Sequence, residues 1–248
     1  MKRTAFYILI GCFIIALWQY FGSTNQTVRV LVSSPYLVMS YFAENVGDLL
    51  RATWITMFEA VVGLIIATFF SFAVMILCFY RPTIMEYVLP VMVTSQIIPL
   101  IVLAPFFIIL LGMGLSSKIA MAVLMCFFPI FVNFAQGYKA IGENVHELLH
   151  IYNAPLRFRI WNVYFPLSLP SIIAGLKISS TLAVIGAIVA EFNGADFGLG
   201  KNLFLSAKRL EPELMMTSLV LSSVLGAALF LSITLIESIF GGWYAKKS

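Results

Sequence analysis

The stretch that decides the fold is TWITMFEAVVGLIIATFFSFAVMILCFY, residues 53–80. It carries one charged side chain, Glu59, in a run that would form about 42 Å of helix, longer than the roughly 30 Å hydrocarbon core of a bilayer. In lipid, every backbone polar group must find its partner within the segment, and a helix achieves this. The stretch therefore predicts a transmembrane helix and an all-α membrane protein.

The remainder of the chain repeats this pattern. Of the 248 residues, 61% are hydrophobic and 10% are charged, and the mean hydropathy of +1.00 leaves no sizeable soluble domain. Apolar segments near 4–21, 53–80, 87–111, 117–138, 171–191 and 214–240 predict six transmembrane helices. The third segment should be kinked or broken, because it contains Pro90, Pro99 and Pro105. The first is expected to remain as an uncleaved membrane helix, since no small-residue cleavage site follows it.

The net charge and the positions of the cysteines argue against two classes of function, nucleic-acid binding and metal or disulfide chemistry. The net charge is a mild +4 with scattered basic residues, which argues against nucleic acid as a partner. Cys12, Cys78 and Cys126 all lie in apolar runs, where we interpret them as small hydrophobic residues rather than as disulfide or zinc ligands.

The distribution of lysine and arginine predicts the orientation, because cytoplasmic helix ends carry an excess of both. One side would hold Lys2, Arg3, Arg81, Lys139, Arg157, Arg159, Lys246 and Lys247, and the other Arg29, Arg51, Lys118, Lys201, Lys208 and Arg209. The acidic residues Glu44, Asp48, Asp196, Glu211 and Glu213 all fall on the second side. We therefore expect both termini and the 139–170 loop to lie in the cytoplasm.

The 139–170 loop is the longest polar segment between predicted spans. Its first part, GENVHELLHIY, has the spacing of a short amphipathic helix. Asn153 tolerates the left-handed conformation that ends a helix, and Pro155 opposes simple continuation. A second short helix, LRFRIWNVYF, is predicted to run to Pro166. The loop should therefore be a compact helical hairpin.

The letters H-E-x-x-H at His146, Glu147 and His150 suggest a different function. In zinc proteases, two histidines one turn apart bind the metal and the glutamate activates its water. The chain has no third histidine, and Asp196, a conceivable third ligand, falls on the opposite side of the membrane. Polar residues just before the motif favour a solvated helix. We predict no metal site, and an intramembrane zinc metalloprotease remains an alternative function.

The same segment resembles the cytoplasmic loop of permease subunits in binding-protein-dependent ABC importers. That loop carries the pattern E-A-A-x-x-x-G, followed later by I-x-x-L-P. Glu147 falls on the glutamate, Asn153 on the glycine and Pro166 on the proline. The chain departs from the pattern at Leu148 and Leu149 in place of the two alanines, Asn162 in place of the isoleucine and Phe165 in place of the leucine. Asparagine is the best physical substitute for a left-handed glycine.

Further motifs resemble the nitrate, sulfonate and taurine branch of this family. They are LVSSP at 31–35, IIPLIVLAPFFIILLGMGLSSK at 97–118, LPSIIAGLKIS at 169–179, AIVAEF at 187–192, GLG at 198–200 and Trp243. Their order along the chain is that of the branch. The resemblance implies a permease domain over 31–245, preceded by a transmembrane helix and the start of an outer loop in residues 1–30.

The resemblance also implies the partners. A six-helix permease of this kind works as a pair, expected here to be two identical copies, in the bacterial inner membrane. An extracytoplasmic binding protein delivers the solute, and two cytoplasmic ATPases drive transport. The chain itself lacks the phosphate-binding pattern G-x-x-x-x-G-K-[ST], so it is expected to be no enzyme and to bind no cofactor. ATP and Mg²⁺ would belong to the partner ATPase.

By the same resemblance, the 139–170 loop would couple the permease to its ATPase. Leucine and tyrosine side chains would supply apolar contact, Glu147 a charged contact, and two arginines would pair with acidic groups of the partner. The candidate coupling residues are Glu147, Leu148, Leu149, Tyr152, Asn153, Arg157 and Arg159.

Polar side chains within the spans are candidates for the translocation path. Glu59 leads them, because a charge inside the membrane is costly and usually faces a cavity or a partner. The alternative is that Glu59 reaches water or pairs with Arg51. Asn133 could instead form an interhelical hydrogen bond. The path candidates are Glu59, Thr94, Ser95, Gln96 and Asn133, and the candidates for docking the binding protein are Glu191 and Asp196.

The sequence does not choose the solute. Members of the branch that the chain resembles carry sulfonates, taurine, nitrate, bicarbonate or pyrimidine-type vitamin precursors. The high phenylalanine content, 22 residues, together with little charge along the path, slightly favours a flat organic solute over a small inorganic anion. A stand-alone secondary transporter is a second alternative function.

Overall fold

A computed structural model of the chain describes residues 9–10, 13–14, 16–20, 33–95, 97 and 99–241. The elements from residue 33 onward are α3 (Pro35–Glu44), α4 (Val46–Tyr80), α5 (Pro82–Ser95), η1 (Leu100–Leu103), α6 (Ala104–Leu111), α7 (Leu115–Lys139), α8 (Glu143–Ile151), α9 (Leu156–Arg159), η2 (Ile160–Tyr164), α10 (Phe165–Gly194), α11 (Leu199–Arg209) and α12 (Pro212–Gly241). Every element in this part of the chain is helical, which confirms the predicted all-α class.

Four helices in the described residues are long and apolar enough to cross a membrane. They are α4, α7, the continuous helix from Leu156 to Gly194, and α12 over Pro212–Ile239. Each contains one of the apolar segments predicted from the sequence. Half of the first predicted span, 4–21, lies outside the described residues, so the count of six spans stays a prediction.

The third predicted span, 87–111, is broken, as its prolines indicate. α5 ends at Ser95, and the chain re-enters a helix only after Pro99, through the 3₁₀ turn η1. Pro105 then occupies the first turn of α6, where its missing N–H costs no hydrogen bond. The two pieces have 14 and 8 residues, so neither spans a bilayer alone.

The prediction that the second hairpin helix ends at Pro166 is wrong. The helix that starts at Leu156 continues through Pro166 and Pro170 to Gly194. A π-helical segment, Ile160–Tyr164, ends two residues before Pro166. Its wider turn relieves the clash that a proline ring makes with the preceding turn of an α-helix. The hairpin is therefore fused rigidly to a membrane helix.

The centre of the bundle is formed by α7 and α10, with α4 packed across both. Ala122 of α7 lies where the three helices approach most closely. A Cβ added at Gly63 of α4 would lie 2.5 Å from the Cβ of Ala122, and one added at Gly186 of α10 would lie 2.8 Å from its Cα. Small residues thus allow the backbones to come together, as is typical of membrane helix packing.

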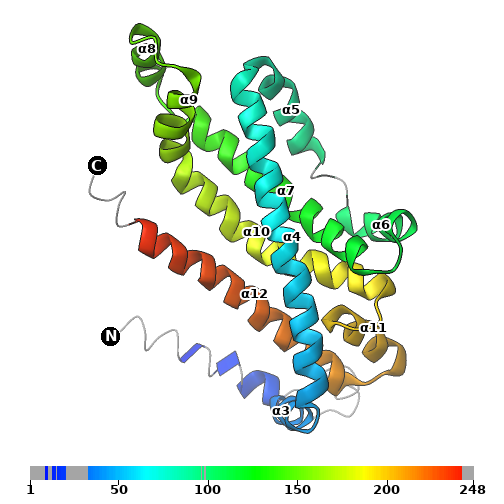
Figure 1. The fold of residues 1–248 in the computed structure, drawn as a ribbon. Coiled ribbons are helices and arrows are strands. Elements are labelled where there is room, and N and C mark those ends of the chain that lie inside the picture. The colour runs from blue at the N-terminus through cyan, green and yellow to red at the C-terminus, as the bar shows by residue number, and fades with distance from the viewer. Residues whose placement is uncertain are drawn as a thin grey trace.

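The bundle has two distinct ends. In Figure 1, α8 and α9 project at one end, whereas α3 and α11 lie at the other, beside the start of α4. The 35 residues of α4 run from one end to the other, about 52 Å. The two candidate sites described next lie at these opposite ends.

Candidate functional site

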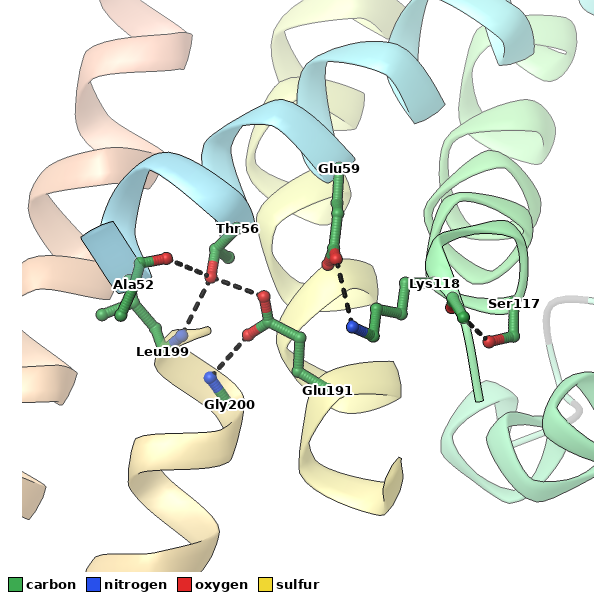
Figure 2. A network of polar contacts seen from close by, with 9 residues as sticks. Ala52, Thr56, Glu59, Ser117, Lys118, Glu191, Leu199 and Gly200 are labelled. Atoms are coloured by element: carbon green, nitrogen blue, oxygen red, sulfur yellow. Dashed lines mark hydrogen bonds and ion pairs between the residues drawn. The ribbon is translucent and has the colours of Figure 1, made fainter. Parts of the chain in front are cut away.

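A network of buried polar side chains lies at the end of the bundle that carries α11. Figure 2 shows it: Thr56 and Glu59 come from α4, Lys118 from α7 and Glu191 from α10, beside the first residues of α11. Thr56 and Glu59 are one turn apart and face the same side of α4. Both glutamates and Thr56 are completely buried, and Lys118 is 8% exposed. Buried charges of this kind are rare in membrane helices unless they have partners or a function.

Glu191 joins three helices through its carboxylate. Its Oε1 lies 2.7 Å from the hydroxyl of Thr56, and its Oε2 accepts a hydrogen bond from the backbone N–H of Gly200 at 2.7 Å. The Thr56 hydroxyl in turn accepts a hydrogen bond of 2.9 Å from the N–H of Leu199. The carboxylate thus satisfies a free N–H in the first turn of α11, where the helix dipole also favours a negative charge.

The glycines of the GLG motif make room for this carboxylate. Gly198 has φ +129°, and a Cβ there would overlap the carboxylate of Glu191. A Cβ at Gly200 would overlap the carbonyl oxygen of Ile188 in α10. The motif at 198–200 therefore serves a close approach of α11 to α10.

Glu59 is completely buried and pairs with Lys118 rather than with Arg51. The Lys118 Nζ lies 3.4 Å from Glu59 Oε1. Neither oxygen of Glu59 accepts a hydrogen bond from the residues that the structure describes. Arg51 instead lies over the ring of Phe197, 4.5 Å from its centroid. A buried charge pair with so few hydrogen bonds stabilises poorly against its loss of hydration.

The network holds two carboxylates against one ammonium group. Through it, α4, α7, α10 and α11 are held in one particular arrangement at this end of the bundle. The arrangement can fix one conformation of the bundle.

The other predicted path residues lie outside this network. The Thr94 hydroxyl, exposed in α5, donates to the carbonyl of Pro90, and the Asn133 amide donates to the carbonyl of Pro129 in its own helix. Ser95 ends α5, and Gln96 lies outside the described residues. Their place in a translocation path stays a prediction, as does that of Glu59.

The two candidates for docking the binding protein, Glu191 and Asp196, differ in how deeply they are buried. Asp196 is exposed in the turn between α10 and α11, whereas Glu191 is completely buried beneath that turn. A carboxylate in this position cannot contact a docking protein in this conformation. Glu191 instead supports the turn that displays Asp196.

The helical hairpin of α8 and α9 forms the second candidate site. Asn153 adopts the left-handed conformation with φ 48°, as the sequence predicts. Its N–H donates to the carbonyl of His150, and the next N–H, of Ala154, donates to the carbonyl of Leu149. These two bonds form the Schellman motif that ends α8 and reverses the chain toward α9.

One face of α8 is free for a partner and the other is not. Glu147, Leu148 and Tyr152 are exposed, together with Arg157 at the start of α9. Leu149 is 7% exposed and packs into the core, so it lies on the opposite face from these residues, and its contact with an ATPase stays a prediction. Arg159 is half-buried, and its Nε donates to the carbonyl of Ala154 at 2.7 Å, which ties it to the hairpin itself.

The two histidines of the H-E-x-x-H sequence have different surroundings. His150 is exposed, whereas the ring of His146 packs against Tyr138 and Tyr164. Among the described residues, no group of three or more His, Cys, Asp and Glu side chains is placed to hold a metal ion. The sequence alone did not reveal the role of His146, because its aromatic neighbours lie in other elements.

Comparison with known proteins identifies the family. Residues 79–247 match the binding-protein-dependent transport system inner membrane component. The chain belongs to this family. It is thus the permease subunit of an ABC importer, a multi-pass membrane protein, and the comparisons give no support to the zinc protease alternative.

Similar permeases serve several solutes. The chain is 32% identical to the formylaminopyrimidine transport permease protein ThiX of Halalkalibacterium halodurans, over 88% of this chain and 90% of that protein. It is 24% identical to the putative aliphatic sulfonates transport permease protein SsuC of Bacillus subtilis, over 88% of this chain and 80% of that one. It is 30% identical to the riboflavin transport system permease protein RibX of Chloroflexus aurantiacus, over 63% and 59%.

Proposed function

We propose that this permease takes up force from a separate cytoplasmic ATPase through the exposed face of α8. The observation that carries the proposal is the hairpin itself. It projects at one end of the bundle (Figure 1), and the side chains of Glu147, Leu148 and Tyr152 are exposed on its surface. It is also continuous with the membrane helix α10. A partner that grips this face moves a membrane helix with it.

The complete importer would contain two copies of this chain, two ATPase subunits and one extracytoplasmic binding protein. ATP and Mg²⁺ would be bound by the ATPases alone. Hydrolysis shifts the permease between outward- and inward-facing states only if α8 is held differently in the two states. Membership of the family supports this composition.

Both termini and the hairpin would lie in the cytoplasm. The lysine and arginine distribution supports this orientation. The opposite end, with α3 and α11, would then face outward, and the exposed Asp196 in the turn before α11 would contact the binding protein. In this arrangement Glu191 and Thr56 hold the docking turn from below.

For the solute, we propose a flat organic molecule, with a nitrogen heterocycle of pyrimidine or flavin type first among them. Two of the similar permeases are named for such solutes, formylaminopyrimidine and riboflavin. Competition for uptake separates this class from the sulfonates: a pyrimidine should inhibit uptake of the natural solute, and an alkyl sulfonate should not. The reverse result would transfer the assignment to sulfonates.

The coupling role is tested by reconstituting the importer, with its ATPase and binding protein, in proteoliposomes. Glu147→Ala should lower ATP-dependent uptake about tenfold or more, because the glutamate lies at the centre of the exposed face. Glu86→Ala is the matched control, an exposed glutamate in α5 and therefore outside the hairpin. Normal uptake by the Glu147 variant, at unchanged membrane content, would reject the coupling role.

A further inference from the structure

The ring of His146 lies between α8 and the membrane helices. Its centroid is 5.6 Å from that of Tyr138, at the end of α7, and 5.4 Å from that of Tyr164, in η2. The two tyrosine rings are 5.0 Å apart and nearly perpendicular. The Tyr164 hydroxyl is 3.5 Å from His146 Nδ1, too far for a strong hydrogen bond. The contact is therefore mainly one of packing.

The cluster continues into the bundle through α4. Phe79, near the end of α4, packs against Tyr138 at 4.9 Å and against Tyr164 at 5.4 Å. It also meets Phe134 of α7 at 5.9 Å, and Phe134 meets Phe72 of α4 at 5.1 Å. An unbroken series of ring contacts thus runs from α8 to Phe72 in α4 and Phe134 in α7.

Helix α8 carries buried side chains on one face and exposed side chains on the other. His146 is half-buried and, with the buried Leu149, faces the bundle, whereas Glu147, Leu148 and Ile151 are exposed. His150 is exposed as well, one turn beyond His146. A partner bound to the exposed face would therefore press α8 onto the rings beneath it.

We propose that His146 is a positioning residue that transmits displacement of α8 to α4 and α7 through the aromatic joint, which we define as His146, Tyr138, Tyr164 and Phe79. The inference rests on the proposed coupling function of α8. Closely packed rings leave no space into which α8 can move without displacing them. Without the imidazole, a cavity remains between α8 and the tyrosines, and α8 can move while the membrane helices stay in place.

The test uses the complete importer in proteoliposomes and measures the amount of radiolabelled formylaminopyrimidine transported per ATP hydrolysed. His146→Ala should lower this ratio about fivefold or more, while ATP hydrolysis continues. His146→Phe should keep the ratio, because it retains an aromatic ring, and His150→Ala should also keep it. A normal ratio for His146→Ala, or an equal loss for His146→Phe, would overturn the proposal.

A second variant covers the case in which His146→Ala prevents assembly with the ATPase. Tyr164→Leu leaves α8 unchanged and removes the ring from the opposite side of the joint, so it should lower the ratio in the same way. If both variants assemble, the losses in the double variant should be smaller than the product of the single losses, because the two residues are in contact. A normal ratio for Tyr164→Leu, or fully multiplicative losses, would contradict the joint.

The experiment also separates this inference from the coupling function on which it rests. If Glu147→Ala abolishes uptake and His146→Ala leaves the ratio normal, α8 couples but the joint does not transmit. If Glu147→Ala transports normally, the coupling function itself fails. In either case the proposal that His146 transmits force is rejected.

Discussion

At the scale of single residues, Glu191 matters because fixed donors surround its carboxylate. The N–H of Gly200 can only donate, and the Thr56 hydroxyl already accepts from the N–H of Leu199. The hydroxyl has a second acceptor for its own proton, the carbonyl of Ala52 at 3.1 Å. The site therefore requires an oxygen facing Gly200 but tolerates a donor facing Thr56.

This asymmetry gives a prediction for two substitutions. Glu191→Ala should destabilise the permease by about 2–4 kcal/mol, because it leaves the N–H of Gly200 buried without a partner and opens a cavity. Glu191→Gln should cost much less, since its oxygen can accept from Gly200 and its amide can donate to Thr56. Thermal unfolding in detergent micelles measures both, and equal losses would show that the carboxylate charge itself is needed.

The Glu59–Lys118 pair gives a second residue-scale prediction. Lys118→Met should lower stability by about 3–5 kcal/mol, because it leaves the buried carboxylate of Glu59 without a cation. Combining it with Glu59→Gln should recover most of that loss, since the double variant has no unpaired charge at this position. The same unfolding measurement checks both. A Lys118→Met variant as stable as the parent would mean that Glu59 is neutral or is hydrated.

At the scale of elements, the sequence predicted helices better than it predicted their ends. Apolar runs and prolines located α4, α7 and the break before Pro99, because lipid allows few alternatives to a helix. The end predicted at Pro166 failed, since a π-helical turn compensates for the proline and leaves no sequence signal of its own. The turn at Asn153 was found because few residues tolerate φ 48°.

That turn carries an element-scale prediction. Asn153→Gly should leave thermal stability and uptake unchanged or slightly improved, because glycine adopts the left-handed conformation without strain. Asn153→Val should cost about 1–2 kcal/mol, since a β-branched side chain clashes there, and should lower uptake by misplacing the hairpin. Unfolding and proteoliposome uptake are compared for the pair. Equal behaviour of the two variants would show that the turn tolerates other conformations.

At the scale of the whole molecule, fold class and family could be predicted from the sequence, but the sites could only be predicted in part. Glu59 stood out as a charge in an apolar run, yet its partner Lys118 is distant in the sequence and became visible only when α4 and α7 were packed. The sequence predicted the correct end of the bundle for Glu191 but a position on the surface, because a single sequence does not show which side chains are buried. Two signals in the sequence could have located the network. One is the spacing of Thr56 and Glu59, which puts both on the same face of α4, and the other is the pair of glycines in the motif at 198–200.

One helix belongs to both sites: α4 contributes Thr56 and Glu59 to the polar network and Phe79 to the aromatic joint. Because α4 is shared, binding at one site changes the affinity at the other, and the effect is equal in both directions. If α8 couples to the ATPase as proposed, a ligand that favours one position of α4 at the α11 end changes the affinity of the ATPase for nucleotide. Nucleotide then changes the affinity for that ligand by the same factor. Loaded binding protein would then act as an effector of the ATPase from across the membrane, with no contact between them.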